Sequence, residues 1–74
     1  MEQKQLSRYY KDGSDEYVDL VEINHEYYEL KYHNDAGVLL SYEIINGHSL
    51  HYVEDACENW ALGIKVAPHE TKSD

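Results

Sequence analysis

The chain has 74 residues and a formal charge of −9, because fifteen Asp and Glu oppose six Lys and Arg. This length allows one domain over residues 1–74 with a small core, and a single cysteine excludes an intramolecular disulfide. The acidic balance argues against direct binding to nucleic acid or to anionic membranes, and it attracts basic proteins. The N-terminus lacks a signal-peptide pattern and no apolar stretch is long enough to span a membrane, so we expect a cytoplasmic protein.

The composition predicts an ordered domain in spite of the charge. Eight tyrosines and one tryptophan can build a core, and the chain has only one proline. We expect order over about residues 6–66. Residues 67–74 should form a frayed tail, because Pro68–Asp74 contains no apolar residue to anchor it.

Turn residues divide the first two thirds of the chain into expected β-strands. Residues 6–11 could form a strand or a short helix, and Lys11–Ser14 is the first turn signal. Residues 17–23 are rich in β-formers up to the break at 24–25, and residues 28–33 alternate between apolar and polar side chains before a second turn at 34–37. Residues 38–45 are the most apolar segment, so we expect this strand at the centre of the sheet, covered on both faces.

The last third changes period. Asn46-Gly47 is typical of a type I′ hairpin turn, which would pair a short strand over about 49–53 with the strand before it. Apolar residues then recur at helical spacing, which predicts a helix over about Glu54–Leu62 with Gly63 at the C′ position and residues 64–66 as a possible last strand. Glu54 and Asp55 would occupy the first helical turn and suit the helix dipole. The fold class is α+β, an antiparallel β meander of about four or five strands packed against one C-terminal helix. The sheet face that the helix covers stays open.

No motif for catalysis or metal binding is recognisable. His48 and His51 would point to opposite faces of a strand, and the segment His25–Glu29 lacks the second histidine of the zinc-protease motif. Cys57 falls on the apolar face of the expected helix, where a thiol is inert. We therefore expect no enzymatic activity, no catalytic residues, no cofactor and no metal.

The acidic residues are the candidate functional residues. Between Asp12 and Ile64 there are twelve carboxylates and one basic side chain, Lys31. Tyrosines are interleaved with these acids and can anchor an interface that the charges reach first. The expected partner-binding residues are Asp12, Asp15, Glu16, Asp19, Glu22, Glu26, Tyr27, Glu29, Glu54, Asp55 and Glu58.

In its short length, its acidic body and its meander followed by a helix over Glu54–Trp60, the chain resembles the small phage-encoded inhibitors of bacterial defence, such as anti-CRISPR proteins and DNA mimics. The resemblance is one of class and is carried by no specific motif. It implies a non-catalytic protein that occupies the basic groove of a nuclease or nucleic-acid-binding complex in the host cytoplasm. Small immunity proteins and acidic antitoxins share these features. A structural module that forms a homodimer or larger homo-oligomer through a strand edge is the second hypothesis, and the sequence leaves the target and the oligomeric state open.

Overall fold

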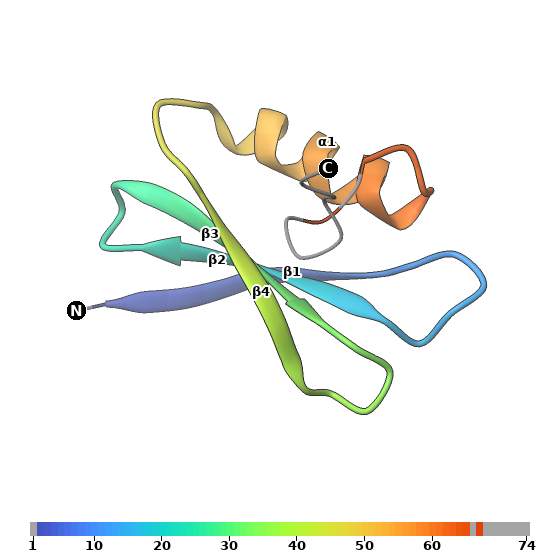
Figure 1. Cartoon of the computed structure of the whole chain (residues 1–74). Helices are drawn as coiled ribbons and strands as arrows, with labels where there is room; N and C mark the ends of the chain where they lie inside the picture. The colour runs from blue at the N-terminus through green and yellow to red at the C-terminus, as the bar shows by residue number, and fades with distance from the viewer. Residues whose placement is uncertain (1, 66, 68–74) are drawn as a thin grey trace, which may run out of the picture.

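The computed structural model describes residues 2–65 and 67. One antiparallel sheet with the strand order β1-β2-β3-β4 is formed by β1 (Gln3–Tyr10), β2 (Tyr17–Ile23), β3 (Tyr27–His33) and β4 (Leu39–Ile45). Helix α1 (Leu50–Ala61) follows and lies on one side of the sheet (Figure 1). The predicted α+β class, with a meander and a helix after it, is confirmed, and the undecided segment at residues 6–11 belongs largely to a strand.

The turn between β2 and β3 has the geometry that we expected at Asn46-Gly47. Asn24 and His25 have φ angles of 52° and 59°. The backbone N–H of Glu26 donates to the carbonyl of Ile23 at 2.9 Å. Two consecutive positive φ angles inside such a turn are the feature of type I′, which matches the twist of the flanking strands. The segment Asn24-His25 therefore closes a tight hairpin.

The hairpin expected at Asn46-Gly47, with a strand over 49–53, is wrong. Gly47 has a φ of 79°, but Asn46 has no positive φ, so the pair cannot form a type I′ turn. Ser49 caps a helix instead, because its hydroxyl accepts a hydrogen bond from the backbone N–H of Tyr52 at 3.2 Å.

This cap moves the start of the helix. α1 begins at Leu50, four residues before the expected start at Glu54, and it ends at Ala61. Glu54 and Asp55 consequently lie in the second turn, and the first turn holds no acidic residue, which corrects the expected fit to the helix dipole. Gly63 has a φ of 84° and follows the C-cap Leu62, so its expected role at C′ is confirmed.

The central position expected for residues 38–45 is also wrong. β4 lies at the edge of the sheet and pairs with β3. A continuous apolar run is typical of strands buried on both faces, but α1 packs mainly against β1, β2 and β3, and Ile45 is the only residue of β4 that is buried. Leu39, Leu40, Tyr42 and Ile44 are consequently exposed.

The core lies between α1 and the sheet. Its buried side chains are Val18, Leu20, Leu30, Tyr32, Ile45, Val53, Cys57, Trp60 and Ala67. Full burial of one large apolar side chain contributes about 1.5–3 kcal/mol, so most of the stability should come from this layer. Trp60 is its largest member and meets the ring of Tyr32 edge-on, with the ring centroids 5.5 Å apart.

The expected last strand is not formed by Ile64 and Lys65, which lie in a bend, and Val66 is outside the described residues. Ala67 was expected in a frayed tail but is buried in the core, and residues 68–74 of that expected tail also lie outside the described part. The part of the chain that the structure describes contains no helix with the length and hydropathy to cross a membrane.

Candidate protein-binding surfaces

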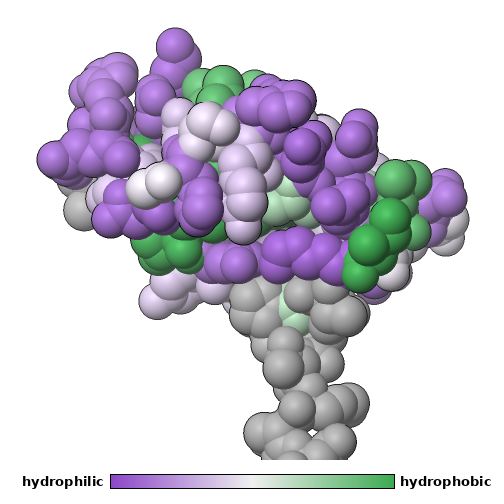
Figure 2. Space-filling model, turned by 90° about the horizontal axis from the view of Figure 1, so that it is seen from above, coloured by the Kyte–Doolittle hydropathy of each residue, from purple (hydrophilic) through white to green (hydrophobic). Residues whose placement is uncertain are grey.

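Six of the candidate carboxylates lie on α1 and on the turn that is tied to its C-terminal end. The backbone N–H of Asp12, in the β1–β2 turn, donates to the carbonyl of Ala61 at 2.7 Å. Figure 2 views the molecule from the helix side and shows hydrophilic side chains over most of that face. We name this region the acidic helix–turn surface, which consists of Asp12, Asp15, Glu16, Glu54, Asp55 and Glu58.

The charges on this surface oppose the dipole of α1. The last turn of the helix contains Glu58 and no basic residue, and Asp12 is held at the carbonyl of Ala61. Carboxylates at the negative end of a helix are unfavourable by about 0.3–1 kcal/mol each when they are exposed. These carboxylates therefore lower the stability of the helix end, and Lys11, whose Nζ lies 5.5 Å from the centroid of the Trp60 ring, offsets them only in part.

Two of these carboxylates, Glu54 and Glu58, act electrostatically on Tyr9 of β1. Burial raises the pKa of the Tyr9 hydroxyl, and Cys57, Glu54 and Glu58 raise it further through their negative charge. Neither Glu54 nor Glu58 lines the hollows beside β4, which the helix lines with Tyr52, Asp55, Ala56 and Asn59. Glu54 and Glu58 thus lie away from β4, and Asp55 lies on the β4 side.

Two further candidates, Asp19 and Glu29, have partners on the sheet face away from α1. Asp19 is 7% exposed and accepts hydrogen bonds from Nε of Arg8 at 2.7 Å and from Nε2 of Gln5 at 3.2 Å. Oε1 of Glu29 lies 3.9 Å from Nζ of Lys31. The contacts of Asp19 hold β1 to β2, and Glu29 is paired with a lysine of its own strand, so we leave both carboxylates out of the proposed interface.

The remaining candidates, Glu22, Glu26 and Tyr27, lie at the β2–β3 turn, at the opposite end of the sheet from the β1–β2 turn. Glu26 is exposed, whereas Glu22 is partly buried and its Oε1 lies 3.4 Å from Nδ1 of His25. The structure therefore separates the eleven candidates into three groups and brings only the acidic helix–turn surface together around α1.

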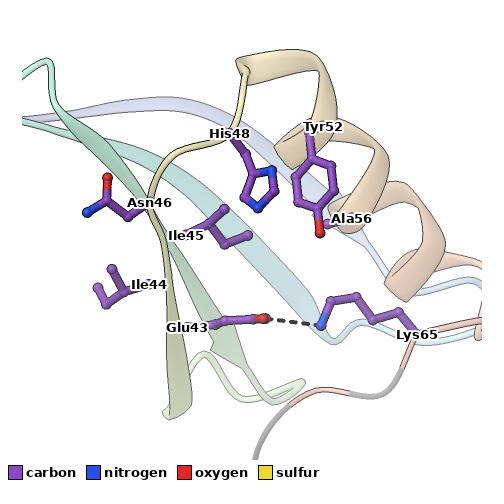
Figure 3. Close-up of a pocket in the computed structure, with 8 residues that line it drawn as sticks. All are labelled: Glu43, Ile44, Ile45, Asn46, His48, Tyr52, Ala56 and Lys65. Atoms are coloured by element: carbon purple, nitrogen blue, oxygen red, sulfur yellow. Dashed lines mark hydrogen bonds and ion pairs between the residues drawn. The ribbon is translucent and has the colours of Figure 1, made fainter.

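Sequence reasoning missed a groove between β4 and α1. Two adjoining hollows of about 240 and 340 Å³ share Tyr52, Ala56 and Lys65 as lining residues. Figure 3 shows Ile45 pointing from β4 toward the helix and Tyr52 lying beside His48, with ring centroids 3.9 Å apart. The only sequence signal for this groove was the apolar run over residues 38–45, which we interpreted as a central strand. We name it the β4–α1 groove; its lining residues are Glu43, Ile44, Ile45, Asn46, His48, Tyr52, Asp55, Ala56, Asn59 and Lys65.

Cys57 lacks the properties of a reactive thiol. It is buried, and burial together with the charges of Glu43 and Glu54 raises its pKa to about 12. The thiol is therefore protonated at neutral pH, whereas a nucleophilic cysteine must be a thiolate. Over residues 2–65 and 67, no three His, Cys, Asp or Glu side chains are grouped to hold a metal ion.

Comparisons of the chain with protein-family models, with curated proteins and with solved structures return no match. The surfaces of the chain itself are therefore the basis for its function.

Proposed function

We propose that the protein is a non-catalytic binding protein that docks its acidic helix–turn surface on a basic surface of another protein. The partner that fits best is a nucleic-acid-binding protein, whose Lys and Arg side chains are arranged to receive phosphates. Carboxylates presented on a rigid helix can occupy such a site and act as an inhibitor in the manner of a nucleic-acid mimic.

One observation carries this proposal, namely that acidic charge gathers where it destabilises the fold. Asp12 and Glu58 both lie at the negative end of α1, whose last turn has no basic residue; Lys11 of the β1–β2 turn lies over Trp60 at this end, with Nζ 5.5 Å from the ring centroid, and offsets them in part. Sites that break a local stability rule are often functional. A basic partner would supply further positive charge and would be attracted before contact.

A pair of matched variants tests the proposal. Asp12→Lys with Glu58→Lys reverses two exposed charges on the acidic helix–turn surface, and Glu2→Lys with Glu26→Lys reverses two exposed charges at the other end of the sheet. Each protein is immobilised and used to capture partners from a nuclease-treated bacterial lysate, with elution in salt steps and identification by mass spectrometry. Wild type and the Glu2/Glu26 variant should retain the same basic protein, and the Asp12/Glu58 variant should lose it.

The captured protein then allows a direct test of inhibition. Wild-type protein should displace a fluorescent duplex DNA from it in an anisotropy titration, and the Asp12/Glu58 variant should not. The same variant should also be at least as stable as wild type, because it places cations at the negative end of α1. Equal capture by both variants would contradict the assignment of this surface, and capture without displacement of DNA would contradict the inhibitory role.

A further inference from the structure

β4 is an open edge of the sheet. It pairs with β3, and within residues 2–65 and 67 no strand lies on its other side. Such an edge presents backbone N–H and C=O groups that can bind a further strand. Proteins usually block their edges with Lys, Pro or inward-pointing charges. The sequence of β4, Leu-Leu-Ser-Tyr-Glu-Ile-Ile, has neither Lys nor Pro. Its one inward-pointing charge, Glu43, is paired with Lys65, and its bulge is confined to the N-terminal end, opposite Tyr32 and His33.

The side chains along this edge are apolar and exposed. Tyr42 is 59% exposed and Ile44 is 49% exposed, and both lie on the sheet face away from α1, opposite Lys31 and Glu29. Val38, Leu39 and Leu40 continue the exposed apolar strip. A contiguous apolar strip on a small, highly charged protein marks an interaction site.

The strip also carries no net charge. Glu43 is the only ionisable acid in β4, and Nζ of Lys65 lies 3.0 Å from its carboxylate. The hydroxyl of Tyr32 donates to the same oxygen at 2.9 Å. Two copies of a chain with a charge of −9 repel each other over most of their surfaces, and this repulsion is weakest at a neutral strip. A basic partner gains no electrostatic attraction from β4, whereas a second copy meets the least repulsion there.

We propose that β4 pairs antiparallel with β4 of a second copy, so that the two sheets join into one and the protein is a homodimer. Pairing of identical strands is satisfied by a two-fold axis, because each position meets its own counterpart or a symmetric one. With Tyr42 on the axis, Glu43 meets Ser41 of the second copy instead of another carboxylate, and Ile44 lies at the bulged residue Leu40. Every cross-strand contact in this register avoids like charges. The proposal goes beyond the proposed function, because β4 contains none of the residues of the acidic helix–turn surface.

The same symmetry joins the β4–α1 grooves of the two copies. A two-fold axis perpendicular to the joined sheet places both α1 helices on one face, above the paired β4 strands. Tyr52, which is 50% exposed, and Ala56 then line a shared trough from both sides. This helix surface adds to the strand contact, and a stable interface needs roughly 1,000 Å² in total.

Disulfide trapping tests the pairing at a chosen position. In the variant Tyr42→Cys two thiols face each other across the axis, where opposed Cα atoms lie about 4.5–5.5 Å apart and within disulfide reach. Mild oxidation should convert most of this variant into a covalent dimer. Lys4→Cys, exposed on the β1 edge, should stay monomeric under the same oxidation. Native Cys57 is buried and should not react in either variant.

Analytical ultracentrifugation tests the association without a covalent bond. Wild-type protein should dimerise as its concentration rises, and added salt should favour the dimer because it screens the repulsion between acidic copies. Ile44→Lys places a charge in both halves of the interface and should raise the dimer dissociation constant roughly tenfold or more, with an unchanged circular dichroism spectrum.

Two results would overturn the proposal. One is a wild-type protein that sediments as a monomer at every concentration and salt, which is also the outcome if the edge is reserved for a strand of a different protein. The other is equal trapping of Tyr42→Cys and Lys4→Cys, because it would show random collision. Neither result bears on the Asp12/Glu58 comparison, so the failure of one proposal is distinguishable from the failure of the other.

Discussion

The two edge strands of the sheet expose different kinds of side chain to solvent. β1 exposes Gln3, Lys4 and Gln5, and a bulge interrupts its pairing between Gln5 and Ser7. Charged and bulged edges resist pairing with other strands. β4 instead exposes an apolar strip beside a groove. The acidic helix–turn surface lies on α1 and the β1–β2 turn, and of its six residues Asp55 alone also lines the groove beside β4. Most of the charge of this surface is therefore separated from the apolar strip of β4. This separation indicates two kinds of contact that need not compete.

The largest expected effect comes from two neighbouring residues of β4 that lie on different faces of the sheet. Ile45 is 8% exposed and belongs to the core, whereas Ile44 is 49% exposed. Ile45→Ala should lower the free energy of unfolding by about 2–4 kcal/mol, because it leaves a cavity under α1. Ile44→Ala should lower it by less than about 0.5 kcal/mol. Urea denaturation at high dilution, where an edge dimer dissociates, measures both, and equal losses would contradict the exposed placement of Ile44.

The same strand shows what the sequence could predict about the fold. Alternating and apolar patterns predicted β2, β3 and β4 as strands, because backbone period and side-chain burial are local properties. The position of β4 in the sheet was not predictable from its composition, since a doubly buried strand and an exposed interface edge have the same apolar run. The turn preference of Asn46-Gly47 was overridden by Ser49, which caps a helix that starts at the next residue, Leu50.

A smaller effect is expected at the contact that fixes the other edge. Asp19 of β2 binds Arg8 and Gln5 of β1 through charge-assisted hydrogen bonds. Asp19→Asn keeps the shape but removes the charge, and it should lower the free energy of unfolding by about 1–2 kcal/mol, a value reduced by the solvent exposure of Arg8. Hydrogen exchange should accelerate in β1 and stay unchanged in β4. Uniform acceleration across the sheet would show that the two edges do not open separately.

The sequence predicted which types of residue form the candidate site, but it did not predict which of these residues lie together in the fold. Asp12 and Glu58 were both selected because carboxylates dominate the chain, but tertiary contacts, such as the hydrogen bond from Asp12 to Ala61 and the approach of Lys11 to Trp60, bring their segments together. Asp19 was selected for the same reason and is used internally by Arg8. The β4–α1 groove was missed, because it depends on which strands the helix covers, and no local pattern determines that.

The smallest effect is expected at alkaline pH, in the core between α1 and the β1 side of the sheet. Burial raises the pKa of Cys57 from about 9 to about 12. The unfolded chain therefore loses this proton first, so the stabilisation is complete below about pH 9 and is lost progressively as the pH rises toward 12. A single group of this kind should lower the free energy of unfolding by less than about 1 kcal/mol at pH 9.5. Denaturation curves at pH 8 and 9.5 measure the difference.

Two substitutions test which side of the molecule causes this loss of stability at alkaline pH. Cys57→Ala removes the thiol and should lose less stability than wild type between pH 8 and 9.5. Tyr9→Phe should also reduce the loss, because burial raises the pKa of Tyr9 in the same direction, whereas Tyr42→Phe on the exposed edge of β4 should leave it unchanged. If all three variants follow the wild-type pH dependence, the thiol ionises alike in the folded and unfolded chains. The β1 side would then contain no buried group whose ionisation lowers the stability at alkaline pH. The β1 and β4 sides would differ only in the charge and the exposure of their side chains.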